Sequence, residues 1–212
     1  SDGAGPRFGG QNPAGVDDFA GGSYEHKATV TVSGGNVGGI DFGFSFNTIV
    51  NTNDTRQGSL RQFVENANAI TGANASIFKI AGTITLITDA SDQGILPTIE
   101  DDGITIDASN QWGNGPYPDG PGIVVVCTTI NDELFYAIDV DNITLRGIYW
   151  KSNRDDVIAF KNSSGNFIGG DPDVNPHYAN YITGAGSGGE GIECDNLDNS
   201  IIIGNYIGIT PD

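Results

Sequence analysis

Apolar residues recur at a helical spacing in one stretch of the chain, residues 59–70. Ser59 stands three residues before Gln62, which is the signature of a capping box at a helix start. Behind Ser59, apolar side chains recur three and four positions apart and form one stripe. Gly72 is a stop signal. The pattern predicts a helix over residues 59–70, with these capping and stripe residues: Ser59, Leu60, Gln62, Phe63, Val64, Ala67 and Ile70.

The polar turn 51–55 precedes this helix, and the chain after it reads as short strands. A single amphipathic helix in front of many strands can cover the open apolar end of an elongated β structure. The alternative is an ordinary surface helix of an α+β domain. The sequence leaves both interpretations open.

A strict alternation of apolar and polar residues predicts a strand just before this turn. Ile40, Phe42, Phe44 and Phe46 alternate with polar residues or glycine. With the β-prone stretch 28–33 and the glycine-rich turn 33–39, they predict a β-hairpin within residues 23–50. Because an isolated hairpin is marginal in water, its apolar face needs a partner. That partner is either a sheet of the same chain or the sheet edge of another molecule, which makes the strand a donor.

Residues 1–22 are rich in glycine and proline and show no periodicity, so they predict a flexible or extended tail. From Ser76 onward, short apolar runs alternate with Gly, Asn and Asp turns. The turn asparagines Asn142, Asn166 and Asn199 recur at intervals typical of stacked coils. Longer gaps are read as loop insertions, at 111–122 and 171–180. Two-residue hairpin turns are scarce, so residues 51–212 predict a parallel β-solenoid rather than a sandwich.

Composition narrows the classes of function. The net charge is −18 with nine basic residues, which argues against nucleic acid and anionic membrane surfaces as partners. No apolar run approaches the ~18 residues of a membrane span. The chain starts at Ser1 without a signal peptide, so we expect a processed, secreted product.

Several phrases carry a resemblance to a known class of proteins. NTNDTRQGSLRQFVENANAI, ITIDASNQWGNGP, NSSGNFIGG and NSIIIGNYIGITPD occur in this order between residues 51 and 212. They resemble phrases of bacterial extracellular right-handed parallel β-helix surface proteins, which share the pectate-lyase-like solenoid. The upstream piece GGNVGGIDFGFSF resembles the last strands of prealbumin-like B-type repeats.

The resemblance implies an all-β fold: a right-handed parallel β-helix with one N-terminal capping helix and an N-terminal β-hairpin extension. It also implies a place outside the cell or on the bacterial cell surface. Related chains continue with further coils where this one stops at Asp212, and no terminal cap is visible in the sequence.

Related β-helices include polysaccharide-cleaving enzymes, so catalysis is an alternative. Asp155 and Asp156 faintly resemble the paired aspartates of β-helix polygalacturonases, but the flanking motifs of that family are missing. Glycoside hydrolysis needs two carboxylates ~5–9 Å apart. A lyase would need an arginine base, for which Arg146 and Arg154 are present without a recognisable acidic cluster. The sequence therefore predicts no catalytic residue.

Calcium is the one cofactor that a motif suggests, and no cofactor is required. Asp171, Asp173 and Asn175 form D-x-D-x-N, which places three oxygen ligands on one side of a loop. The pattern lacks the glycine and distal glutamate of an EF-hand. Cys127 and Cys194 either form one disulfide or are two separate small residues.

These observations predict a non-enzymatic extracellular structural protein. Its subunits would assemble head to tail into a surface filament or stalk through the N-terminal strand and the open C-terminal coil. One alternative is a β-helix that binds or cleaves surface glycans, with Trp112, Tyr117, Tyr149 and Trp150 stacking on sugar rings. Another is a fragment of a large surface adhesin.

Overall fold

The computed structural model describes residues 31–35, 46–87, 94–152 and 155–212. Within them the chain is mostly strand, its sheets are parallel, and α1 is the single α-helix. Two predicted segments lie wholly or mostly outside the described residues: the tail 1–22 and the hairpin 23–50, including Ile40, Phe42 and Phe44. The elements are β1 (Thr48–Ile49), α1 (Leu60–Ala69), β2 (Ile77–Phe78), β3 (Gly82–Thr85), β4 (Thr105–Asp107), β5 (Ile123–Cys127), β6 (Phe135–Ile138), β7 (Thr144–Arg146), β8 (Ile148–Ser152), β9 (Ile158–Ser164), β10 (Phe167–Gly169), β11 (Tyr181–Thr183), β12 (Ile192–Asp198), β13 (Ile201–Ile203) and β14 (Tyr206–Ile207), with 3₁₀ turns η1 (Ser109–Gln111) and η2 (Pro176–Tyr178).

The predicted helix is confirmed as α1. Ser59 is its N-cap, and the Ser59 hydroxyl accepts a hydrogen bond from the Gln62 backbone N–H at 3.2 Å. The Gln62 side chain instead bonds Asn66, so half of the capping box forms. Ile70 was wrongly assigned to the buried stripe: it is the C-cap residue and is 39% exposed, because the helix ends before it. The buried apolar residues of α1 are Leu60, Phe63, Val64 and Ala67.

The polar turn before α1 is held by its own side chains. Asn51 Oδ1 accepts the Asn53 N–H at 3.1 Å, which closes an Asx turn. Asp54 forms an ion pair of 2.8 Å with Arg61, whose residue is only 4% exposed. The sequence pattern did not reveal this buried arginine on the inner side of α1.

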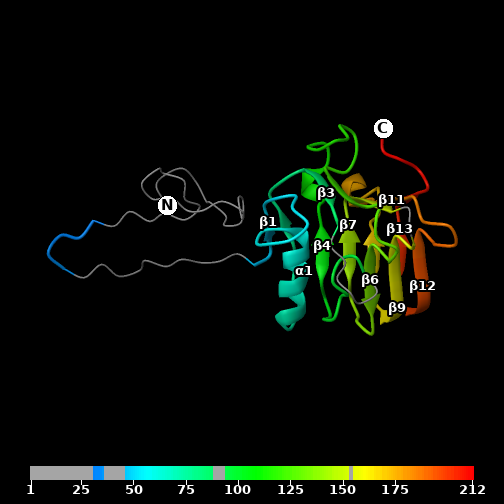
Figure 1. Ribbon diagram of the computed structural model, residues 1–212, viewed down its shortest axis with the longest axis horizontal. Coiled ribbons are helices and arrows are strands. Elements are labelled where there is room, and N and C mark those ends of the chain that lie inside the picture. The colour runs from blue at the N-terminus through cyan, green and yellow to red at the C-terminus, as the bar shows by residue number, and fades with distance from the viewer. Residues whose placement is uncertain (1–30, 36–45, 88–93, 153–154) are drawn as a thin grey trace.

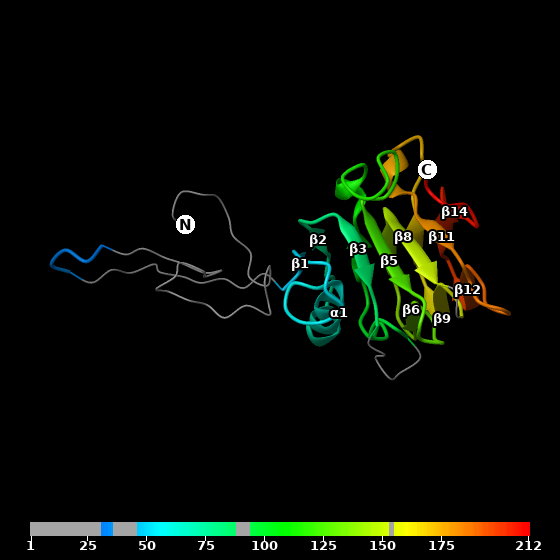
Figure 2. The ribbon, with the colours of Figure 1, turned by 45° about the horizontal axis from the view of Figure 1, so that its top comes forward.

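Three parallel sheets carry the body of the molecule. Sheet I has the order β12-β9-β6, sheet II has β13-β10-β7-β4, and sheet III has β14-β11-β8-β5-β3. From β6 onward the chain visits sheets I, II and III in this fixed order, and we call each such passage a round. The last round is β12, β13 and β14. Figures 1 and 2 show successive rounds lying side by side in chain order.

Pairing between rounds is in register, so like positions stack into columns. In sheet II, Leu145, Ile168 and Ile202 form one column, since Ile168 pairs with both neighbours. Side chains alternate between the two faces of a strand. Every second position therefore adds an apolar side chain to one continuous core, which also includes the buried residues of α1.

A left-handed backbone conformation repeats toward the end of each strand of sheet I, and we call this position the corner. Asp139 follows β6, whereas Asn162 and Asn196 lie within β9 and β12, and their φ angles are 56°, 50° and 54°. Their side chains form a ladder: Asn162 Nδ2 donates to Asp139 Oδ1 at 3.1 Å, and Asn196 Nδ2 donates to Asn162 Oδ1 at 3.0 Å. Asparagine and aspartate tolerate this conformation better than most residues.

The two ends of the stack differ. At one end, α1 lies beside the first strands (Figure 1). At the other end, β12, β13 and β14 are each the last strand of their sheet within the described residues. In that part of the chain, no helix is long and apolar enough to span a membrane.

Candidate functional site

The last round presents an apolar surface, which we call the open face. Its large apolar side chains are each 40–59% exposed. Their counterparts in the preceding round are covered, because that round has a neighbour on both sides. The exposed side chains of the open face are Ile201, Ile202, Ile203, Tyr206, Ile207 and Ile209.

Among the described residues, the open face is the end of the core beyond the last strands. Ile202 stands in register with Ile168, and Ile207 with Ile182, and both partners are fully buried core residues. Full burial of an isoleucine side chain is worth about 1.5–3 kcal/mol. An edge that combines free backbone groups with such side chains is a template for pairing with another strand.

A column of tyrosines also reaches the open face. Tyr149, Tyr181 and Tyr206 are in register in sheet III, and the rings of Tyr181 and Tyr206 stack at 4.5 Å between centroids. One face of the Tyr181 ring is thus covered by Tyr206, whose own ring is exposed. A further flat side chain would extend the same column.

Of the predicted strand-donor residues, Phe46 is described. Its side chain is exposed, and its carbonyl oxygen accepts a hydrogen bond from Asn66 of α1 at 3.0 Å. Phe46 borders a depression of about 390 Å³ beside the start of α1, which Thr48, Gln62 and Phe63 also line. The chain therefore enters the body next to the helix, at the end opposite the open face.

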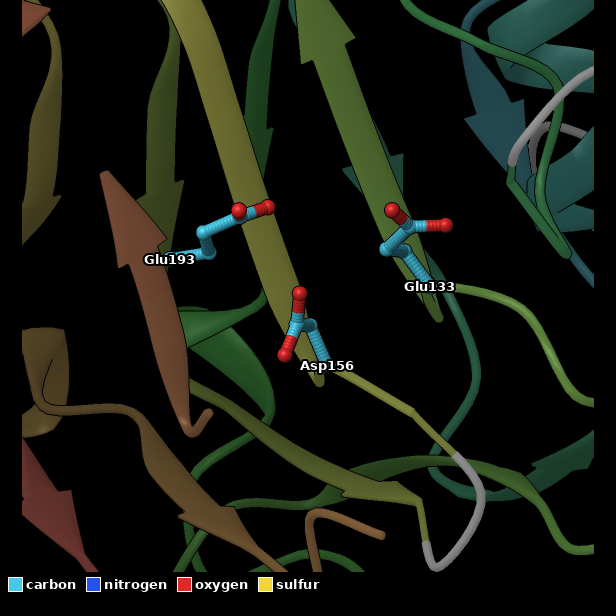
Figure 3. A group of neighbouring side chains, drawn as sticks. All are labelled: Glu133, Asp156 and Glu193. Atoms are coloured by element: carbon cyan, nitrogen blue, oxygen red, sulfur yellow. The ribbon is translucent and has the colours of Figure 1, made fainter. Parts of the chain in front are cut away.

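A carboxylate cluster lies on sheet I, one residue from each of three rounds. Carboxylate oxygens of Glu133, Asp156 and Glu193 all lie within 4.8 Å of one another. Figure 3 shows the three carboxylates turned toward the same space, from the starts of β6 and β9 and from β12. Asp156 is only 6% exposed, and its Oδ1 accepts the Glu190 backbone N–H in a short hydrogen bond.

The pKa values of several groups in and beside this carboxylate cluster are shifted. A hydrogen bond to Asp156, together with the charge of Asp156, raises the pKa of Glu190. Burial raises the pKa of Glu133, and the nearby charge of Asp132 adds to it. Lys161 Nζ lies 3.1 Å from Glu193 Oε2. Burial lowers the pKa of Lys161, but the hydrogen bond and charge of Glu193 outweigh it, so this pKa is raised.

The cluster has the donor set of a hard cation. Ca²⁺ binds oxygen ligands at about 2.3–2.6 Å, so three oxygens this close can share one ion. The lysine already pairs with one of the three, and it would compete with an incoming cation. The oxygens lie closer together than the ~5–9 Å that glycosidases need. Asp156 is also buried and engaged, so the geometry lends no support to the glycosidase alternative.

Sequence reasoning considered Asp156 but missed Glu133 and Glu193. A signal was present, because Phe135 pairs with Ile158 and Ile158 with Ile192. Those pairs place Glu133 and Asp156 two residues before the same strand position, whereas Glu193 follows that position in the next round, so this signal leads to Glu133 and not to Glu193. The register of the rounds is needed to read that signal, and it is a tertiary property.

The predicted calcium ligands Asp171 and Asn175 of the 171–175 loop also accept hydrogen bonds from backbone N–H groups of their own turn. Asp171 Oδ1 accepts the Asp173 N–H at 2.9 Å, and Asn175 Oδ1 accepts the His177 N–H at 3.0 Å. Two of the three expected ligand oxygens therefore stabilise the loop and the start of η2. The expectation of calcium itself stays a prediction.

The two cysteines do not form the disulfide that the sequence left open. Cys127 is buried in β5 of sheet III, while Cys194 is exposed in β12 of sheet I, and both are free thiols. Cys194 is in register with the buried Phe160, so it belongs to a core column at the open face. Burial, together with the charge of Glu193, raises the pKa of the Cys194 thiol.

The aromatic residues considered for sugar stacking are largely occupied. Tyr149 and Trp150 are fully buried in β8, which contradicts their predicted role in stacking on sugar rings. Trp112 stacks on His177 at 5.3 Å, and the Tyr117 ring meets Tyr149 edge-on at 5.6 Å. These contacts hold the 111–122 insertion against the sheet.

Arg146, considered as a lyase base, is also engaged. Its guanidinium lies over the rings of Phe167 and Tyr178, at 4.9 Å and 4.4 Å from the centroids. Its Nε donates to the Gly169 carbonyl at 3.2 Å. The other candidate, Arg154, lies outside the described residues.

No protein-family model and no solved structure matches this chain. The class that the fold defines is a mostly-β protein with separate parallel sheets and, in the described residues, a single α-helix. Its function is inferred from its own residues and contacts.

The raised pKa of Glu133 yields a prediction about pH. Because the folded-state pKa lies above the unfolded value, stability is lost as pH rises through the folded pKa. We expect Glu133→Gln to raise Tm by about 1–2 °C near neutral pH. The gain should vanish at about pH 3.5, where wild-type Glu133 is protonated. Calorimetry at both pH values tests this, with the exposed helix residue Glu65→Gln as control. An equal gain at both values would rule out charge as the cause.

Proposed function

We propose that this protein is a non-enzymatic structural subunit: a right-handed parallel β-solenoid that assembles head to tail with other copies of itself. The observation that carries the proposal is the open face. Within the described residues, the core ends in exposed isoleucines and in three strands that have a neighbour on one side, and such an end is complementary to a further parallel round. The repeated visit to sheets I, II and III in one order supports the solenoid.

The contact is proposed to be heterologous because the two ends differ. At the end of the first strands, α1 adds Leu60, Phe63 and Val64 to the core, whereas the last round of the described residues ends in strands, so the two ends present different surfaces. Phe46, the described residue of the predicted donor strand, lies at this same end, where its carbonyl oxygen accepts a hydrogen bond from Asn66 of α1. Contacts between different patches propagate into filaments when the rotation does not close.

The proposed setting is outside the cell, on a bacterial surface, as a filament or stalk. The net charge of −18 suits a soluble extracellular surface and disfavours nucleic-acid partners. The resemblance to extracellular β-helix proteins points to the same setting. Surface glycans are the weaker alternative, since Tyr149 and Trp150 are buried.

Sedimentation velocity over a range of protein concentrations tests the assembly. We expect wild type to form concentration-dependent oligomers, and Ile202→Lys to stay monomeric, because a charge would be buried in the contact. Deletion of residues 1–46 should also yield monomers by removing the donor strand. Val174→Lys is the matched control: Val174 is 76% exposed in a side loop, so this variant should assemble as wild type does. A monomeric wild type at all concentrations would refute the proposal.

The chain carries its own reporter of this contact. Cys194 is exposed at the open face, whereas Cys127 is fully buried and serves as an internal reference. A thiol reagent at alkaline pH, where the raised pKa of Cys194 is overcome, should label one thiol per monomer. In oligomers Cys194 should be protected at least tenfold. Oligomers whose Cys194 reacts as fast as in the Ile202→Lys variant would place the contact elsewhere.

A further inference from the structure

The open face specifies which segment would dock on it. We propose that residues 32–42 of a second copy form the next round, parallel to residues 192–202 and in register with them. This inference rests on the proposed head-to-tail assembly and names its partner segment. It follows from four features of the rounds, each of which is compared with residues 32–42.

The first feature is the pair of left-handed corner positions. Asp139 and Asn142, then Asn162 and Gly165, then Asn196 and Asn199 have positive φ at the same spacing in three successive rounds. Only glycine, asparagine and aspartate adopt this conformation at little cost. In register, Asn36 and Gly39 of the second copy fall on the positions of Asn196 and Asn199.

The second feature is the core columns. Leu145, Ile168 and Ile202 form the column that ends at the open face in sheet II. Phe42 of the second copy falls on this column and would cover Ile202. In sheet I the column of Ile158 and Ile192 would receive Val32, an exposed apolar residue in the separate chain. Docking would therefore bury the side chains of Ile192 and Ile202, which lie at the two ends of the contact, and remove their apolar surface from water.

The third feature is the polarity of the corner ladder. Each asparagine donates its amide to the preceding round, so Asp139, which can only accept, fits only as the first rung. Asn196 Oδ1 is the next acceptor of the ladder. Asn36 supplies the amide donor that this oxygen requires, and an aspartate there would set two acceptors against each other.

The fourth feature is charge. Glu193, Asp195 and Asp198 of the last round would face Ser33, Gly35 and Gly38, which carry no charge. The single acidic residue of the segment, Asp41, would face Ile201. In a chain with a net charge of −18, this register avoids like charges on adjacent strands. The match ends at Phe42, because Phe44 would fall on Gly204, whose φ of 68° suits glycine.

Disulfide trapping in the full chain tests the register. Gly34 would lie beside Cys194 on the core side, at the spacing of adjacent strands, which a disulfide can bridge. Gly35 would point to the opposite face. Neither glycine has another atom within 4 Å of where a Cβ would lie, so Gly34→Cys and Gly35→Cys are matched in space, while Gly34, whose φ is 73° in the separate chain, has to become extended on docking. Each variant is oxidised with oxidised glutathione at a concentration where wild type is oligomeric and is then run on a non-reducing denaturing gel.

We expect Gly34→Cys to form a ladder of disulfide-linked dimers and longer species, with at least tenfold more crosslinked product than Gly35→Cys. We also expect Asn36→Asp to weaken the association of the chain about tenfold relative to wild type. Equal crosslinking of the two variants, or a disulfide within one chain, would overturn this inference while leaving the assembly intact. A wild type that stays monomeric would refute the assembly itself, so the two failures are distinguishable.

Discussion

Replacing Asn180 with alanine is expected to lower the free energy of unfolding by about 3 kcal/mol. Asn180 is fully buried between sheets II and III. Its Nδ2 donates to the Leu145 carbonyl at 2.9 Å, and its Oδ1 accepts the Ile148 N–H at 3.2 Å. Its Nδ2 also donates to Asn205 Oδ1 of the last round at 3.0 Å. Alanine removes a shared partner of two backbone groups, and each buried group left unpaired costs about 1–3 kcal/mol.

Urea unfolding at concentrations where the protein is monomeric measures this loss. The control is Asn114→Ala, an exposed asparagine in the 111–122 insertion, for which we expect a change below about 0.5 kcal/mol. A loss below about 1 kcal/mol for Asn180→Ala would mean that water replaces the amide without penalty. The site would then be wetter than its burial indicates.

Phe160→Ala is expected to cost about 3–5 kcal/mol, because it deletes a large core side chain. Phe160 is fully buried in β9, and its ring packs against Phe135 of the preceding round at 5.6 Å. It stands in register between Ala137 and Cys194, so both of its neighbours in that column are small. The cavity would lie directly beneath the open face.

Chemical unfolding of the monomer tests this, with Phe160→Leu as the milder control at about 1–1.5 kcal/mol. The labelling rate of Cys194 should change in Phe160→Ala and not in Asn114→Ala, since only Phe160 underlies that thiol. A cost as small as that of the leucine variant would show that the last round collapses into the cavity.

Local patterns in the sequence predicted the local structure well. The Ser59 signal and the apolar spacing behind it located α1 within a residue or two. Both depend on hydrogen bonds and packing within one helical turn, which neighbouring residues determine. The prediction that Ile70 belongs to the helix was wrong because α1 ends at Ala69. The Asn74 side-chain amide donates a hydrogen bond to the Ile70 carbonyl just beyond that end.

The chemistry of side chains far apart in the sequence was predicted poorly. Glu133, Asp156 and Glu193 have no local motif, yet their carboxylates meet. A motif states which residues are close in sequence, whereas a binding site depends on which ones the strand register brings together.

The sequence by itself determined the elements: α1, the short strands, the corners rich in Asn and Gly, and the recurrence of turns at intervals typical of stacked coils. These depend on backbone preferences and on the alternation of apolar residues, which act over a few positions. The tertiary structure alone decided the register. Register placed Cys194 and Ile202 at the uncovered end of core columns and buried Tyr149 and Trp150. The physical reason is that a column forms only when parallel strands from different rounds pair, and a shift of one residue would turn every side chain to the other face.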